Sequence, residues 1–225
     1  MKSELHPFSL ESIKKYLDNH KSGSNPYDKY FYLENGSIIF NSILIEEALV
    51  LSKTIYYGDG LKFINCELRY ISQGMFNGLE FENTKVDKID IIKTEKSQFN
   101  HLLIDSESKV SFITVNDIKV NNISIRYSNI LSLDIRNSKT INEIEILGSE
   151  IYTIIFQKSS VQFFNIIGLS KIDSFNLTSE VEIFNIYLIA IIKSFINFEG
   201  SSVVKLDIDD LSKIGVFRMM EGSKI

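Results

Sequence analysis

The sequence predicts an all-β solenoid, in which short parallel strands stack in successive coils around a narrow apolar interior. Three observations lead to this prediction: a short apolar motif that recurs through most of the chain, a second period of about 21 residues in the polar positions, and Ile, Val and Phe at most apolar positions. Together they indicate a chain that is built from one repeated unit.

The recurring motif places apolar residues at positions 0, +3 and +5 of a segment of about ten residues. One unit has Ile130, Leu133 and Ile135 at these positions, and the next unit begins at Ile141. The last two apolar positions are separated by one residue, which is the period of a β-strand, and so short a unit has no room for an additional helix. Each unit therefore predicts one short strand and one bend. Thirteen consecutive units begin at Val86, Phe99, Val110, Val120, Ile130, Ile141, Ile151, Val161, Ile172, Val181, Ile192, Val203 and Ile214.

The polar positions indicate that one coil contains two units. Amide or acidic residues occupy the +1 position of every second unit, and serine recurs two positions before the first apolar residue of the intervening units. Because stacked coils bring equivalent residues into contact, this period of about 21 residues is the expected coil length. The columns either form a ligand-binding face or satisfy polar groups at the corners of the coils. The first column is Asn100, Asn121, Asn142, Gln162 and Glu182, and the second is Ser108, Ser128, Ser149, Ser170 and Ser212.

This repeat resembles the right-handed parallel β-helix class and is loosely similar to pectate-lyase-like proteins. The resemblance covers about residues 63–219 and depends on the periodicity, without a family-specific catalytic motif. It implies a single right-handed parallel β-helix with about 21 residues per coil. A leucine-rich repeat horseshoe is the alternative fold, but both halves of each coil have the same strand motif, and Ile and Phe replace much of the expected Leu.

The N-terminal part shows the motif only weakly. We expect residues 1–62 to form a cap and the first strands, in front of the repeats in residues 63–225, with the whole chain as one structural unit. A cap is expected because an uncovered solenoid end exposes unpaired strand edges and apolar side chains. Residues 9–20 are the expected N-terminal capping helix, with Ser9 as its first residue and Ile13 on its apolar face.

The C-terminal end of the repeats has no comparable cap in the sequence, because only six residues follow the last unit, which ends at Met219. Three arrangements would cover it. The last coil pairs with a second copy as a homodimer, the chain continues in a longer protein, or the six residues fold back over the edge.

Composition and charge make several classes of protein improbable. A net charge of -5 and a pI near 5.3 argue against nucleic-acid binding, and no apolar run approaches the length of a membrane-spanning helix. The first residues do not resemble a signal peptide, so the expected location is cytoplasmic, with no membrane partner. Cys66 is the single cysteine and the three histidines are scattered, so we expect no disulfide, no metal site and no cofactor.

No recognised catalytic motif is present, which favours a non-catalytic interaction or scaffold protein that binds a protein partner through its extended surface. The alternatives are a carbohydrate-binding or carbohydrate-cleaving β-helix and a phage-type or anti-defence inhibitor. Asp207, Asp209 and Asp210 form an acidic cluster that could hold calcium, act on a sugar or be a solvated edge. One outward column could hydrogen-bond a saccharide or be an ordinary polar face, and its binding candidates are Glu145, Asn165, Asn185 and Asp207.

Overall fold

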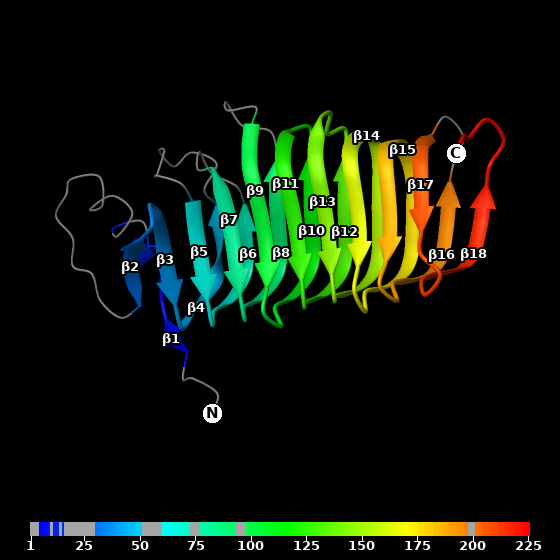
Figure 1. The fold of residues 1–225 in the computed structure, drawn as a ribbon. Coiled ribbons are helices and arrows are strands. Elements are labelled where there is room, and N and C mark those ends of the chain that lie inside the picture. The colour runs from blue at the N-terminus through cyan, green and yellow to red at the C-terminus, as the bar shows by residue number, and fades with distance from the viewer. Residues whose placement is uncertain are drawn as a thin grey trace.

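Successive strands stack on one another along one axis (Figure 1). This computed structural model describes residues 5–9, 11–13, 15, 30–50, 60–72, 77–92, 98–197 and 201–225. The strands are β1 (His6–Pro7), β2 (Phe31–Glu34), β3 (Ser37–Asn41), β4 (Ile43–Val50), β5 (Gly60–Ile64), β6 (Glu67–Ser72), β7 (Gly78–Glu82), β8 (Lys85–Ile92), β9 (Gln98–Asp105), β10 (Lys109–Asn116), β11 (Lys119–Arg126), β12 (Asn129–Arg136), β13 (Ile141–Leu147), β14 (Glu150–Ile167), β15 (Lys171–Tyr187), β16 (Ile191–Asn197), β17 (Ser202–Ile208) and β18 (Lys213–Met219).

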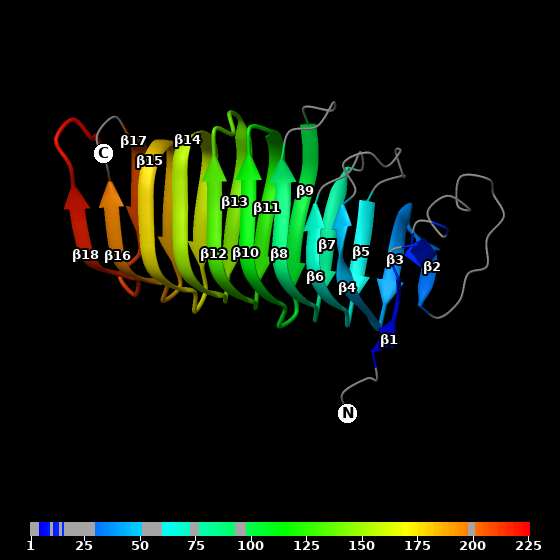
Figure 2. The ribbon, with the colours of Figure 1, turned by 180° about the vertical axis from the view of Figure 1, so that it is seen from behind.

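Parallel hydrogen bonding arranges these strands on two faces that enclose the apolar side chains. Face A consists of β4, β6, β8, β10, β12, β16, β18 and the first halves of β14 and β15. Face B consists of β3, β5, β7, β9, β11, β13, β17 and the second halves of β14 and β15. In Figure 1 the chain runs down the strands of face B, which lie in front, and up the strands of face A, which lie behind. It advances to the right with each turn, so the coil is right-handed. Figure 2 shows face A in front. The predicted parallel β-solenoid is confirmed, with about 8 turns.

The register of the strands follows the apolar motif. Ile130 of β12 lies between Val110 of β10 and Ile151 of β14, and the +3 and +5 positions of these strands are aligned as well. The coil length of about 21 residues is confirmed by this register. Side chains at the +3 position, such as Ile154 and Phe175, are fully buried between the two faces. The alternation of inward and outward side chains along each strand therefore builds one continuous apolar column.

Hydroxyl groups close the corner where face B turns into face A. Ser149 Oγ donates to the carbonyl oxygens of Leu147 at 2.9 Å and Ile125 at 3.2 Å, and it accepts the Ser128 amide at 3.1 Å. One buried hydroxyl thus satisfies three backbone groups that a tight corner takes away from water. Of the two roles open for the serine column, the structure supports the corner role. All five predicted members are buried: Ser108, Ser128, Ser149, Ser170 and Ser212.

The N-terminal end of the stack is covered. Strand β2 runs antiparallel to β3 through a turn at Asn35 and Gly36, which both have positive φ. Residues 11–13 and 15 are helical, and the Ser12 amide donates to Ser9 Oγ at 3.1 Å, as expected of an N-cap. Ile13 is fully buried in the core. The structure supports a helical turn at the predicted cap, and residues 16–20 of the predicted helix lie outside the described residues.

The stack of parallel coils begins earlier than the motif suggests. Strand β3 already pairs in parallel with β5, with Ser37 opposite Gly60, and β4 pairs with β6 through a register shift between Ile45 and Ala48. The register shift changes the spacing of the apolar residues, which is why the motif is weak in this part of the sequence. The division of the chain at residue 62 stays a prediction. No helix in the described residues is long and apolar enough to span a membrane.

The C-terminal end differs from the N-terminal one. Strand β18 pairs with β16 on one side, and within the described residues no strand pairs with its other side. The last residues return to β17, where the Val203 amide donates to the Lys224 carbonyl at 3.0 Å. Phe217 and Met219 occupy inward positions of the motif, yet they are 41% and 46% exposed. The last coil is therefore only partly covered.

Candidate functional site

The four predicted binding residues are brought into one column on face B. Parallel pairing places Glu145 beside Asn165, Asn165 beside Asn185, and Asn185 beside Asp207. Asn185 Nδ2 donates to Asn165 Oδ1 at 2.8 Å, and Asn165 Nδ2 donates to Glu143 Oε1 at 2.8 Å. Ladders of this type satisfy polar side chains within the protein.

The ends of this column are also engaged. Glu145 Oε1 accepts from Ser124 Oγ at 3.1 Å and from Arg126 Nε at 2.8 Å. Asp207 lies 3.5 Å from the Lys205 ammonium group, and its hydrogen bond with the Tyr187 hydroxyl raises the pKa of that tyrosine. A saccharide would have to compete with these internal contacts, and its binding to the column stays a prediction.

The acidic cluster at the end of β17 is divided between two environments. Asp207 is in the strand, whereas Asp209 lies in the following turn and accepts the amides of Leu188 at 2.6 Å and Ser212 at 2.9 Å. Hydrogen bonds from Ser212 and from the Leu188 amide lower the pKa of the Asp209 carboxyl. Asp209 therefore stabilises the corner, and because β17 ends at Ile208, Asp207 and Asp209 do not share one face of a strand. The described residues contain no group of three or more side chains that could hold a metal ion.

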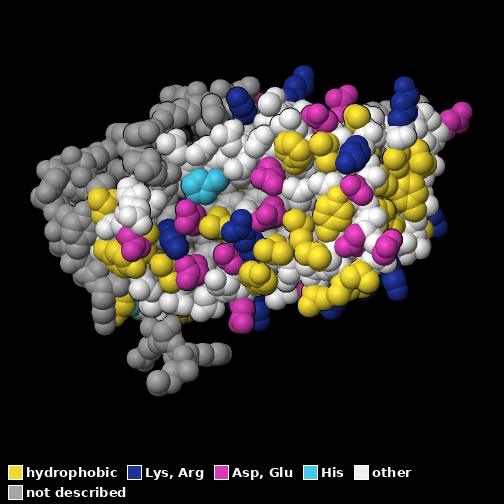
Figure 3. Space-filling view, in the orientation of Figure 1, with side chains coloured by type: hydrophobic (Ala, Val, Ile, Leu, Met, Phe, Trp, Pro, Cys, Tyr) yellow, Lys and Arg dark blue, Asp and Glu magenta, His cyan; other side chains and the backbone are white. Residues whose placement is uncertain are grey.

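A histidine and a glutamate form a second polar pair on face B. His101 Nε2 lies 3.0 Å from Glu80 Oε1, and this hydrogen bond lowers the pKa of the Glu80 carboxyl. Gly78 makes room for the ring, because a Cβ at that position would come within 2.3 Å of it. Figure 3 shows that charged and apolar side chains are interspersed over this face.

A buried carboxylate lies on face A among β6 and β8. Asp90 Oδ2 accepts from the Tyr70 hydroxyl at 2.9 Å and lies 2.8 Å from the Lys88 ammonium group. Burial, followed by the bond to Asp90, raises the pKa of Tyr70 to about 12. Within the described part of the chain, Asp90 Oδ1 is buried without a hydrogen-bond partner.

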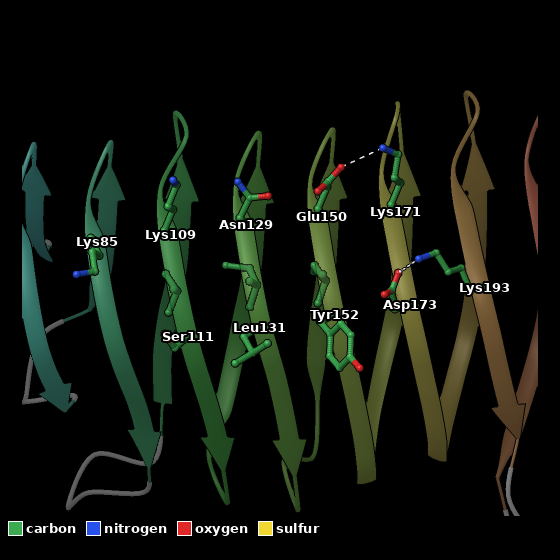
Figure 4. Close-up of a pocket in the computed structure, with 13 residues that line it drawn as sticks. Lys85, Lys109, Ser111, Asn129, Leu131, Glu150, Tyr152, Lys171, Asp173 and Lys193 are labelled. Atoms are coloured by element: carbon green, nitrogen blue, oxygen red, sulfur yellow. Dashed lines mark hydrogen bonds and ion pairs between the residues drawn. The ribbon is translucent and has the colours of Figure 1, made fainter.

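A groove of about 670 Å³ crosses the strands of face A. Leu131 of β12 and Tyr152 of β14 lie in it and are 48% and 60% exposed. Both are at the +1 position of their units, so they lie on adjacent strands (Figure 4). Phe112 of β10 is also exposed and pairs in register with Ser132, the residue after Leu131. Three large apolar side chains from three successive coils therefore lie on the same region of face A.

Charged side chains surround these apolar residues. Lys171 Nζ lies 3.0 Å from Glu150 Oε1, and Lys193 Nζ lies 2.7 Å from Asp173 Oδ1, as the dashed lines in Figure 4 mark. Lys109 also lines the groove, between Lys85 and Asn129 in register, and no acidic side chain of the described residues pairs with it. The groove thus combines an apolar centre with a charged rim.

The groove residues left only a faint signal in the sequence. The +1 positions of the face A units do not belong to the amide column, and two consecutive ones are the large apolar residues Leu131 and Tyr152. Phe112 is at a +2 position, where the motif gives no prediction. Two consecutive bulky apolar residues at one outward position were the signal that could have indicated this surface.

Comparison of the chain with protein-family models, curated proteins and solved structures finds no match. The β-solenoid fold is shown by the structure, and the closer similarity to pectate-lyase-like proteins stays a prediction.

Proposed function

We propose that this protein is a non-catalytic β-solenoid that binds a protein partner through the groove of face A. The observation that supports this proposal is the exposed pair Leu131 and Tyr152 at the centre of a groove with a charged rim. Protein interfaces commonly combine an apolar or aromatic centre with a polar rim, and tyrosine is frequent among the residues that dominate binding. The expected cytoplasmic location stays a prediction from the sequence.

The scaffold around the groove favours binding without a large ordering cost. The lining side chains project from consecutive strands of one sheet whose inward residues, Ile130 and Ile151, are buried in the core. A surface that is held in one conformation before binding loses little conformational entropy when the partner arrives. The two carboxylates of the groove, Glu150 and Asp173, are already in ion pairs, which suits a role in the rim of an interface.

A selection with peptides tests the proposal directly. The chain would be immobilised and screened against a phage library that displays random 12-residue peptides, and enriched peptides would be measured against a Leu131→Ser/Tyr152→Ser double variant. We expect binding to fall at least about tenfold, because the two anchors bury apolar area that serine cannot replace. Enriched peptides that bind the double variant equally well, or no enrichment over an uncoated support, would contradict the proposal.

A matched control separates the groove from general surface hydrophobicity. Leu169, in the corner after β14, is 67% exposed and does not line the groove. Leu169→Ser should leave peptide binding unchanged. Far-UV circular dichroism and a thermal melt of all three proteins would show that the substitutions leave the solenoid folded.

The saccharide alternative has its own test. A glycan array probed with the unmodified chain, with Asn165→Ala/Asn185→Ala as the comparison, measures whether the outward column of face B binds sugars. Glycan binding that is lost in this variant and kept in Leu131→Ser/Tyr152→Ser would favour the carbohydrate function over the protein-binding one.

A further inference from the structure

We infer that the C-terminal coil pairs tail to tail with the same coil of a second copy of this chain, through antiparallel contact of the two β18 strands. This inference does not depend on the groove of face A. It begins from the burial of the phenylalanine column. The rings of Phe195 and Phe217 stack at 5.2 Å and 5°, but Phe195 is 1% exposed and Phe217 is 41% exposed. Phe217 has a neighbour on one side only.

Other apolar side chains gather at the same end. Val204, Ile208, Val216, Met219 and Met220 are all exposed on or next to β17 and β18. Figure 3 shows apolar side chains gathered at the end of the molecule that contains these strands. Exposed apolar side chains that gather at one end of a soluble protein indicate a contact site.

The backbone of β18 is available for pairing. Its outer edge has no partner strand within the described residues, whereas β17 already accepts the returning chain at Lys224. β18 contains no proline, and its charged residues, Lys213 and Arg218, occupy outward positions of the register. Edge strands that do not associate are usually protected by proline, an inward charge or a covering segment, and β18 lacks the first two.

The opposite end of the solenoid determines the geometry. There, β2 lies antiparallel on β3 and Ile13 is buried against the core, so the N-terminal coil is covered. A head-to-tail stack of copies would need that end to be open. Tail-to-tail contact about a twofold axis covers both open ends at once and closes the assembly at two copies.

The charges at the two ends of β18 fit an antiparallel copy. Lys213 is the first residue of β18, four residues before Phe217, and Glu221 lies in the turn after β18, four residues beyond Phe217. When two β18 strands run antiparallel with Phe217 opposite its counterpart, each Lys213 lies next to the turn of the other copy that contains Glu221. Within one chain the length of β18 separates these two residues, and neither has an ion-pair partner among the described residues. If charge substitutions at Lys213 and Glu221 compensate for each other, the two side chains therefore interact between two copies of the chain.

A charge exchange tests this inference. The molar mass of the 225-residue chain would be measured by size-exclusion chromatography with light scattering over a dilution series, and we expect a dimer. Lys213→Glu and Glu221→Lys should each weaken the dimer about tenfold, because each places two like-charge pairs in the interface. The double variant Lys213→Glu/Glu221→Lys should restore most of the lost affinity. Lys119→Glu, an exposed lysine in the middle of the stack, is the control and should leave the dimer unchanged.

The remaining outcomes overturn the inference. A chain that stays monomeric at its highest soluble concentration has no such contact, and hydrogen exchange that shows slow β18 amides in that monomer would mean that its own last residues cover the edge. A dimer whose double variant is no tighter than the single variants is formed through another surface. The Leu131→Ser/Tyr152→Ser variant should dimerise normally, so a failure of the groove proposal and a failure of this one are distinguishable.

Discussion

The middle coils and the last coil of this solenoid share one apolar motif but differ in how well it is buried. Phe175 and Phe195 at the +3 position of β15 and β16 are almost completely buried, whereas Phe217 at the same position of β18 is 41% exposed. The sequence of a unit therefore determines which way a side chain points. Its burial depends on having a coil on both sides, as expected for a repeat protein whose stability comes from contacts between neighbours.

The largest expected effect comes from a charge in the middle of the stack. Phe164 is fully buried and its ring lies 5.2 Å from those of Phe175 and Phe184. Phe164→Asp should lower the free energy of unfolding by more than about 4 kcal/mol, because it removes a large apolar side chain and buries a carboxylate without a partner. Urea denaturation followed by far-UV circular dichroism measures this.

The matched change at the end is Phe217→Asp. Its side chain already reaches water, so we expect a loss of about 1 kcal/mol in the monomer. Equal losses for Phe164→Asp and Phe217→Asp would contradict the difference between the middle and the end of the stack.

A corner hydroxyl gives an intermediate effect. Ser149→Ala removes the acceptor of the Ser128 amide and the donor to two carbonyl oxygens, which should cost about 1–3 kcal/mol. Ser212, in the last coil, accepts the Ala190 amide at 3.1 Å and lies nearer to the open end. Ser212→Ala should cost less than Ser149→Ala in the same urea titration, and the reverse order would break the comparison.

A substitution of the single cysteine, Cys66, tests whether hydrogen bonds like those of the corner serines also stabilise the coils nearer to the N-terminus. Cys66 Sγ donates to the carbonyl oxygens of Phe40 and Ile64, as the serine hydroxyls do further along the stack. Cys66→Ser should change the free energy of unfolding by less than about 1 kcal/mol. Burial raises the pKa of the Cys66 thiol to about 12, so at pH 8 the buried thiol is protonated and reacts slowly with an alkylating reagent. We expect alkylation at pH 8 only when these coils unfold. Rapid alkylation of the folded chain would show that this region opens locally.

The smallest effect is a pH dependence on face B. The hydrogen bond from His101 lowers the pKa of Glu80, so the ionised carboxylate stabilises the folded chain. That contribution is complete above the ordinary glutamate value and is lost as the pH falls through the lowered one. Because both side chains are partly exposed, we expect about 0.5 kcal/mol. Glu80→Gln should flatten the stability profile in this acidic range, and an unchanged profile would show that the pair contributes nothing.

The stack could be predicted from the sequence because each inward position repeats with little variation. The alignment of Val110, Ile130 and Ile151 follows from the spacing alone, and so does the buried serine column. The amide column was predicted only in part. Asn121 Nδ2 donates to Asn100 Oδ1 at 2.7 Å, but Asn142 Nδ2 donates to Asn122 Oδ1 at 3.4 Å, one position away from the expected partner. Outward side chains can choose among neighbours, and the repeat does not determine that choice.

Other features could not be predicted because they depend on how different coils lie side by side. Strands β14 and β15 continue through the corner that the repeat predicts as a bend. The groove combines +1 residues of three successive coils, Ser111, Leu131 and Tyr152, and the exposed Phe112 lies on the same face without lining it. A second buried serine column lies at the opposite corner; three of its members stand two residues before the first apolar residue of a unit, as in the first column, and Ser138 stands three before. Its members are Ser138, Ser159, Ser179 and Ser201.

The corner hydroxyls have a consequence for the size of the molecule. The hydrogen bonds of the corner serines join residues of the same turn or of adjacent coils, as those of Ser128, Ser149 and Ser170 show. These contacts therefore do not depend on the total number of coils. Duplicating or deleting one complete coil in the middle would preserve every type of contact in the stack. The length of the face A surface, and with it the size of what it can hold, is thus a quantity that this architecture can change in whole-coil steps.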